Sequence, residues 1–318
     1  MAVYVNTNYS ALQGQRYLGN VQNQLTTTYQ RLSSGMRINS AKDDAAGLQI
    51  ADRLTSQING LNQGNRNASD GIALAQTMEA GMDEISGMLQ KVRTLAVQAN
   101  NGTNTSDDRR AIGKEMEALV NEVNRIAQKT TFAGKTILNG QIAGSIFGDP
   151  AAGGANKGPA GDTGTLTLQV GSNKGDTISF TSDSVMFSKI GSGDLMGDAA
   201  GKVFKTSADG TITVTLTKAA TDASDTSISA IINLMDSMIS KVDGARADLG
   251  ALQNRLESSI RNQSNVAANE ADARSRIRDA DFAEESANLS QQSIIQQAAA
   301  SMLMQANTRP QLGLSLLG

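Results

Sequence analysis

The sequence predicts a mainly α-helical protein: a discontinuous long-helix hairpin, a coiled-coil bundle formed by both termini, with a small β-rich insertion in the middle. Small and apolar residues recur at steps of three and four towards both ends of the chain, whereas parts of the middle alternate with a period of two. The 318 residues include 6 Phe, 4 Tyr and no Trp, so aliphatic and methionine side chains must build the core. That composition suits long packed helices.

The first helix is expected over residues 11–32. One side of it carries Ala11, Gly14, Leu18, Val21, Leu25, Thr28 and Leu32. This alternation of three- and four-residue steps is typical of a coiled-coil strand. A seam this narrow cannot stabilise an isolated helix against its ordering entropy, so the first helix needs a partner.

A second, longer helix is expected over residues 54–96, because the apolar rhythm continues there with one short step at Met78. Asn101-Gly102 ends this helix. Residues 105–107 (TSD) then offer a cap and first-turn acid for a third helix, which we expect to fold back on the second. Its apolar face contains Ile112, Met116, Leu119, Val123 and Ile126.

The middle of the chain changes character. Residues 143–164 are rich in Gly, Ala, Pro and Asp and are expected to form a loop or flexible insertion. Residues 165–170 and 176–181 alternate in period two around a glycine-bounded turn, which predicts a β-hairpin, and residues 210–217 show the same strand pattern.

Helical rhythm resumes from Ile228 to Leu256, and a last seam follows near the carboxyl end. The two ends of the chain share the problem of a narrow seam, so residues 1–43 and 274–318 are expected to pair. Apolar surface would remain exposed on that pair, and self-association would cover it. The predicted assembly seam consists of Ala11, Leu18, Val21, Leu25, Leu32, Ile277, Ala280, Ala287, Ile294 and Met302.

Methionines are expected to fill irregular gaps between the helices at core positions such as Met82, Met116, Met235 and Met302.

The composition excludes most kinds of catalytic site, metal site and charged partner. The chain has 28 Lys and Arg against 31 Asp and Glu, a net charge of −3 that gives no electrostatic case for nucleic acid or an anionic membrane as partner. It has no Cys and no His, which removes thiol nucleophiles, imidazole bases and nearly every transition-metal site. We therefore expect no enzyme, cofactor or metal site, and we interpret Asp43-Asp44 as a helix start rather than a cation site. No membrane span or secretory signal peptide is readable either.

Two motifs at opposite ends carry a family resemblance. Residues 32–48 read LSSGMRINSAKDDAAGL, which resembles the amino-terminal signature of bacterial flagellins. Residues 276–285 (RIRDADFAEE), 305–307 (QAN) and 314–317 (LSLL) are similar to the flagellin carboxyl-terminal pattern. The resemblance covers about residues 1–142 and 225–318 and implies a structural subunit that polymerises into the flagellar filament for swimming.

The resemblance also implies that different segments of the chain form different parts of the filament. Residues 1–43 and 274–318 would form the inner tube of the filament, and residues 44–142, 165–190 and 225–273 a helical shell with the β-hairpin. Residues 143–164 and 191–224 would form a variable, surface-exposed insertion. The terminal helices would become ordered only on assembly.

Further implications concern export and partners. The chain would leave the cell unfolded through the flagellar type III apparatus, without a cleaved signal peptide, and would be extracellular. The family's partners are other copies of the subunit, the filament cap, the hook-junction proteins and an export chaperone.

Two surfaces match positions at which flagellins meet innate immune receptors. The patch facing the Toll-like flagellin receptor would comprise Lys91, Leu95, Gln98, Ile112 and Glu115. Lys91 replaces the usual arginine, whose planar contacts an ammonium cannot reproduce, so weaker recognition is implied. The tail matching intracellular sensors would comprise Leu314, Leu316 and Leu317. The alternative interpretation of both surfaces is packing between subunits.

Two other functions stay open at this point. A flagellin-like hook-filament junction protein shares the terminal patterns but does not polymerise indefinitely. An exported effector would act mainly by engaging a host receptor through residues 88–116. The discriminating feature is whether activity needs the terminal seams.

Overall fold

The computed structural model describes residues 7–140, 142, 144–148, 163–191, 203–206, 211–216 and 226–315, without the side chains of residues 206, 226–229 and 309–315. The chain packs as two compact units, Met1–Asn59 with Asn265–Gly318, and Gly60–Ser264. We call them the terminal unit and the central unit. No helix in the described ranges is long and apolar enough to cross a membrane.

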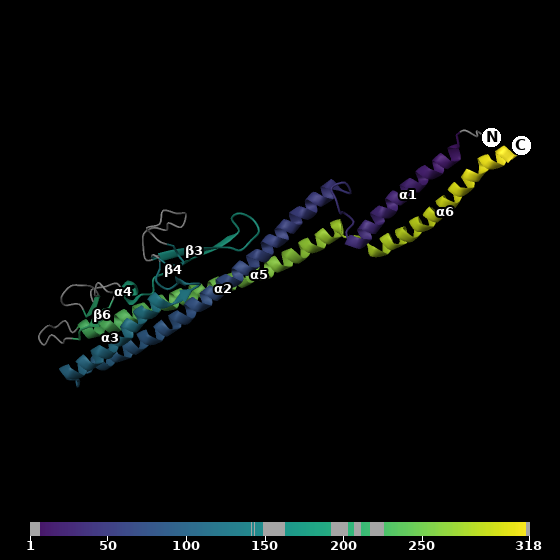
Figure 1. Cartoon of the computed structure of the whole chain (residues 1–318). Helices are drawn as coiled ribbons and strands as arrows, with labels where there is room; N and C mark the ends of the chain where they lie inside the picture. Colours follow the sequence, from purple (N-terminus) through teal and green to yellow (C-terminus); the bar gives the residue numbers. More distant parts are fainter. Residues whose placement is uncertain are drawn as a thin grey trace. The chain divides into compact units, whose positions relative to one another are not determined.

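The core of the central unit lies between three helices: α2 (Ala45–Ala99), α3 (Ser106–Lys129) and α5 (Thr226–Arg278). Figure 1 shows α3 alongside α2, as the sequence predicts. The predicted apolar faces meet in one cluster of buried residues, in which Met78, Met82, Met116, Met235 and Met238 have no or almost no exposed surface. Thioethers therefore fill the space that aromatic side chains occupy in many other cores.

The turn between α2 and α3 follows the predicted signals. A capping box starts α3: the Thr105 hydroxyl accepts from the Asp108 amide at 3.2 Å, and the Asp108 carboxylate accepts from the Thr105 amide at 2.9 Å. The buried guanidinium of Arg109 donates to the carbonyls of Ala99 (3.1 Å) and Asn101 (3.4 Å). Arg109 thus satisfies the end of α2 and fixes the turn.

A small hairpin follows α3. Strands β1 (Thr131–Phe132) and β2 (Lys135–Thr136) pair across Ala133 and Gly134, which both have positive φ (50° and 80°). Two left-handed residues between short strands are typical of a type I′ turn.

The predicted β-hairpin is confirmed. Strands β3 (Thr163–Gln169) and β4 (Thr177–Asp183) are antiparallel and in register from Thr163↔Asp183 to Gln169↔Thr177. Its end lies close against α2, because a side chain at Gly64 would overlap the Val170 carbonyl, and one at Gly60 would come within 2.7 Å of Ser172 Cβ. The absence of side chains at these two positions allows the close approach.

A third hairpin, formed by β5 (Phe204–Thr206) and β6 (Ile212–Val214), lies within the segment predicted to be a surface insertion. Strand β6 was expected, but β5 and the short helix α4 (Phe187–Ile190) were not. Phe204 and Ile212 are buried in the central core, and the Asn121 side chain on α3 bonds both backbone groups of Ile212. Residues 191–224 therefore include buried structure. Strands this short, held in place by a helix side chain, have no periodic sequence pattern from which they could be predicted. The predicted insertion 143–164 lies largely outside the described residues.

The terminal unit contains α1 (Tyr9–Ser34) and α6 (Phe282–Ser315), which lie side by side in Figure 1, as predicted. It also includes the start of α2 and the end of α5, where Arg274 Nη1 donates to Thr55 Oγ1 at 3.4 Å. The terminal unit thus extends further along these helices than residues 1–43 and 274–318.

One packing prediction is wrong within this chain. Met302 was expected in a helical core, but it is 71% exposed on α6. The apolar rhythm of the carboxyl end does not point consistently towards α1, so a heptad position read from sequence alone does not identify the buried face.

Candidate assembly surface on the terminal helices

The terminal unit is organised around two breaks that bond to each other. Gly35 ends α1 with φ 70°, and its amide donates to the Arg31 carbonyl. The Arg37 amide donates to the Arg278 carbonyl at 2.7 Å, and the Ala280 amide donates to the Gly35 carbonyl at 3.0 Å. The break after α1 and the break between α5 and α6 are therefore joined by backbone hydrogen bonds, so α1 and α6 start from a common point.

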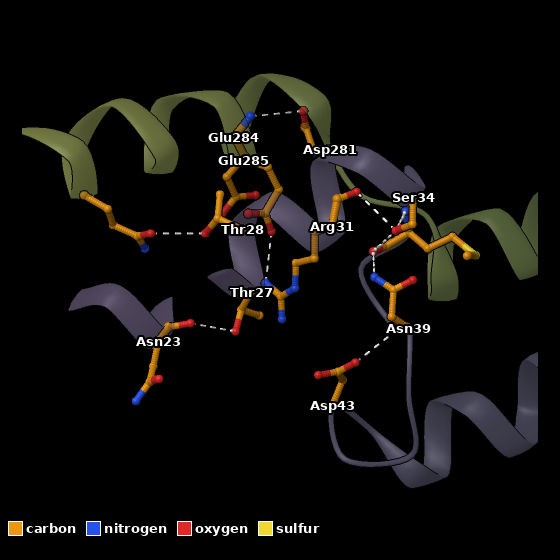
Figure 2. A network of polar contacts seen from close by, with 12 residues as sticks. Asn23, Thr27, Thr28, Arg31, Ser34, Asn39, Asp43, Asp281, Glu284 and Glu285 are labelled. Atoms are coloured by element: carbon orange, nitrogen blue, oxygen red, sulfur yellow. Dashed lines mark hydrogen bonds and ion pairs between the residues drawn. The ribbon is translucent and has the colours of Figure 1, made fainter. Parts of the chain in front are cut away.

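Carboxylates stabilise the loop that leads into α2. Asp43 accepts from the amides of Asn39 (3.1 Å) and Ser40 (2.9 Å), and Figure 2 shows it facing Asn39. These bonds lower the pKa of the Asp43 carboxyl, with the Ser40 amide as the largest cause and the Ser40 hydroxyl next. Asp44 accepts from the Gly47 amide at 2.9 Å and so caps α2. The interpretation of this acidic pair as a helix start is confirmed.

Polar contacts join α1 to α6 close to these breaks. Arg31 Nη1 and Glu285 Oε1 form an ion pair at 2.9 Å, with side chains 32% and 9% exposed (Figure 2). One turn earlier on α1, the Thr28 hydroxyl donates to the Gln292 side chain at 3.2 Å. These bonds are directional, so they fix how α1 and α6 are aligned along their length.

Further along the pair the contacts become apolar and close. A Cβ on Gly14 would lie 3.2 Å from Leu303 Cδ1, which is tight but allowed by a small shift of a flexible side chain. Near the amino end, the Asn8 side chain caps α1 and its Nδ2 donates to the Ala306 carbonyl at 2.8 Å. Contacts between the helices therefore extend from Asn8 to Arg31.

The predicted seam residues fall into two groups, those that are buried or half-buried and those that are exposed. Those on α1 lie on its inner side, with Val21 buried and the others half-buried: Ala11, Leu18, Leu25 and Leu32. Ile277 and Ala280 are half-buried at the break before α6. By contrast Ala287, Ile294 and Met302 are exposed on α6.

The face of α6 that meets α1 was missed by the sequence analysis. It uses Glu285, Gln292, Leu303 and the Ala306 carbonyl, a set in which polar side chains interrupt the apolar spacing. The sequence offered only a chemical signal: Thr28 and Arg31 on α1 can bond to polar side chains on α6. That their partners are Gln292 and Glu285 becomes clear only from the distances in the fold.

The outer faces of this pair carry many large apolar side chains. The exposed ones are Tyr9, Leu12, Tyr17 and Tyr29 on α1, and Phe282, Ile294, Ile295, Met302 and Met304 on α6. Among described residues of the central unit, only Val97 and Ile142 are large, hydrophobic and exposed. Apolar surface concentrated in this way is typical of a surface that associates with other protein.

The predicted receptor patch is only partly a surface. Lys91, Gln98 and Glu115 are exposed, and Leu95 is half-buried against the core. Ile112 is 8% exposed and belongs to the central core. The tail residue Leu314 is in α6 but its side chain lies outside the described residues, as do Leu316 and Leu317 entirely.

Both ends of the chain match one protein family. Residues 5–143 match the bacterial flagellin N-terminal helical region, and residues 232–317 match the bacterial flagellin C-terminal helical region.

Full-length relatives agree with this match. The chain is 36% identical over 383 aligned residues to Polar flagellin C of Vibrio parahaemolyticus, with 100% of both chains covered. It is 36% identical over 379 residues to Flagellin B of Vibrio cholerae, again with 100% of both covered.

A solved structure described as that of a flagellar hook-associated protein from Vibrio parahaemolyticus has a similar fold. Its TM-score is 0.54 at 15% identity, covering 74% of this chain and 100% of that one. At this identity the similarity concerns the fold alone.

Proposed function

This chain belongs to the bacterial flagellin family and is a structural subunit of the extracellular flagellar filament, not an enzyme, and on that premise we propose that the α1·α6 pair joins neighbouring subunits. The observation that carries the proposal is the concentration of exposed apolar side chains on the outer faces of this pair. Water contact with that surface is unfavourable, and packing against other copies removes it.

The two faces of the pair have different tasks in this proposal. The inner face, with Val21, Arg31 and Glu285, holds α1 to α6 within one subunit. The outer face, with Ile294 and Met302 among its residues, contacts other subunits. Residues 1–43 and 274–318 form the filament's inner tube, residues 44–142, 165–190 and 225–273 its shell, and residues 143–164 and 191–224 its outward insertion.

Ordering of the pair is coupled to assembly. Within α1 only Val21 and Thr28 are buried, the contacts with α6 are partly polar, and the large apolar side chains on the outside stay exposed. A free subunit gains little from forming this pair, whereas a subunit joining the filament buries both faces at once. The terminal helices therefore form fully at the filament end.

The test separates the outer face from general effects of charge on α6. Ile294→Asp should abolish seeded filament growth, because it puts an unpaired carboxylate into an apolar contact. Gln297→Asp adds the same charge at an exposed polar position of the same helix and should support growth. Electron microscopy of seeded filaments measures growth, and circular dichroism before and after seeding measures the added helix.

Contrary results are clear. Normal filaments from Ile294→Asp would show that the outer face of α6 is not a subunit contact. If the unchanged chain never elongates seeds, a junction role is the better account.

Partners outside the polymer follow the family. The chain would pass unfolded through the flagellar type III apparatus, with an export chaperone, and meet the hook-junction proteins and the filament cap. A Toll-like flagellin receptor would contact Lys91, Gln98 and Glu115, whose exposure supports the proposal, with Leu95 beside them. Because Ile112 is buried, it would pack beneath this surface and would not contact the receptor itself. Intracellular sensors would read Leu314, Leu316 and Leu317.

A further inference from the structure

The sequence contains three Asn-Gly steps, at residues 59–60, 101–102 and 139–140. This dipeptide is chemically labile, because the glycine amide nitrogen can attack the asparagine side-chain carbonyl without obstruction by a Cβ. Attack needs a backbone free to bend and an accessible side chain. The three steps differ sharply in both respects.

Two of the steps are protected by the fold. Asn59 and Gly60 lie inside α2, where the helical hydrogen-bond ladder holds the backbone rigid. Asn139 is 9% exposed, and its side-chain oxygen accepts from the Ser184 hydroxyl at 3.4 Å. Neither asparagine can readily reach the geometry for ring closure.

The third step is open. Asn101 and Gly102 are exposed in the turn between α2 and α3. Among the described residues the Gly102 amide has no hydrogen-bond acceptor. The Asn101 side-chain oxygen accepts from the Thr103 amide at 3.4 Å, which polarises the carbonyl carbon that would be attacked.

We propose that Asn101 is a site of spontaneous deamidation. The Gly102 nitrogen bonds to Asn101 Cγ and loses its proton, while the Cγ–Nδ2 bond breaks and ammonia leaves. Water then opens the cyclic imide at either carbonyl, giving an aspartyl or an isoaspartyl residue. No oxidant, reductant or cofactor takes part. Water is the only co-reactant.

The position gives the reaction a structural consequence. Arg109 holds the turn by donating to the carbonyls of Ala99 and Asn101. An isoaspartyl link adds a methylene to the main chain within this clamp and displaces the Asn101 carbonyl. The new carboxylate also lies close to a second set of bonds in this turn. The Asn101 amide and the Asn104 side chain both donate to the Gln98 carbonyl. Ageing thus alters charge and geometry at one defined turn.

The test follows the full-length protein during prolonged incubation at mildly alkaline pH, with peptide mass spectrometry at each asparagine. The expected result is modification at Asn101 several-fold faster than at Asn59 or Asn139, with both aspartyl and isoaspartyl products. In denaturant the three steps should react at similar rates, because only the fold distinguishes them. Equal rates in the folded protein would overturn the proposal.

Gly102→Ala is the matched variant. A Cβ at this position meets nothing within 4 Å, so the fold should be kept, which circular dichroism verifies. The added Cβ hinders attack by the residue 102 nitrogen, so deamidation at Asn101 should slow several-fold while Asn59 and Asn139 are unchanged. An unaltered rate at Asn101 would show that the reaction does not proceed through this nitrogen.

Discussion

The guanidinium of Arg31 and the carboxylate of Glu285 meet at 2.9 Å although 254 positions separate them in the chain. Their ion pair lies next to the point where the backbones of residues 35 and 280 bond, so it aligns α1 with α6 at the base of the pair. Small and apolar contacts tolerate sliding, whereas a charge pair is satisfied in one alignment only. Register of the terminal helices therefore depends on this polar contact.

Reversing the charge of Glu285 should weaken the terminal pair. Glu285→Lys places two cations together in a half-buried site, which we expect to cost about 1–3 kcal/mol. The double variant Arg31→Glu with Glu285→Lys restores opposite charges and should recover most of the loss. Seeded filament growth, with circular dichroism of the helix gained, measures both.

Glu284→Lys is the control for this charge reversal. Glu284 is exposed on the same first turn of α6, so its reversal has the same effect on the helix dipole without touching Arg31. If Glu284→Lys impaired growth as strongly as Glu285→Lys, the helix start and not the ion pair would be responsible.

Gly64 and Gly87 offer a matched pair on α2. Gly64→Ala should destabilise the central unit by about 1–3 kcal/mol, because the new methyl overlaps the Val170 carbonyl and displaces the end of the β3–β4 hairpin. Gly87→Ala has open space around it and should stabilise the helix by up to about 1 kcal/mol. Urea unfolding of both variants gives the comparison. Equal changes in the free energy of unfolding of the two variants would contradict the close approach of the β3–β4 hairpin to α2.

The capping box of α3 should respond to pH. Hydrogen bonds from the Thr105 hydroxyl and then the Thr105 amide lower the pKa of the Asp108 carboxyl. The folded carboxyl binds its proton less readily than the unfolded one, so the cap is complete above the ordinary pKa of aspartate. Its contribution is lost as pH falls through the lowered pKa.

An NMR titration can check this cap directly. Thr105→Ala should move the pKa of Asp108 back towards its ordinary value and cost about 1 kcal/mol through the lost hydroxyl cap. An unchanged titration of Asp108 in Thr105→Ala would mean that Thr105 is not the cause of the shift.

Ile112 and Lys91 should separate a core role from a surface role. Ile112→Ala removes buried side-chain volume and should lower the free energy of unfolding by about 2–4 kcal/mol. Lys91→Ala changes an exposed side chain and should stay within about 0.5 kcal/mol of the unchanged chain. Urea unfolding measures stability, and receptor binding by folded Lys91→Ala tests the surface. Binding unaffected by Lys91→Ala would remove this residue from the receptor patch.

Periodicity predicted the long helices of the central unit, because their apolar residues recur at helical spacing. The run from Met78 to Ala96 and the run from Ile231 to Leu256 are both buried as spaced. The hairpin around residues 171–175 was equally readable, since alternation and a glycine-bounded turn coincide there. By contrast β5 has only three residues, too few to show a period, and depends for its place on β6, which in turn contacts α3.

By itself, the sequence determined the long helices, the starts of α2 and α3, the main hairpin and the pairing of the two ends, because local spacing and turn chemistry act over a few residues. Only the tertiary structure decided which face of α6 meets α1, that Ile112 is buried, and which Asn-Gly step lies open. These depend on contacts between residues far apart in the chain. A polar contact such as Thr28 with Gln292 has no periodic signature and exists only once both helices are in place.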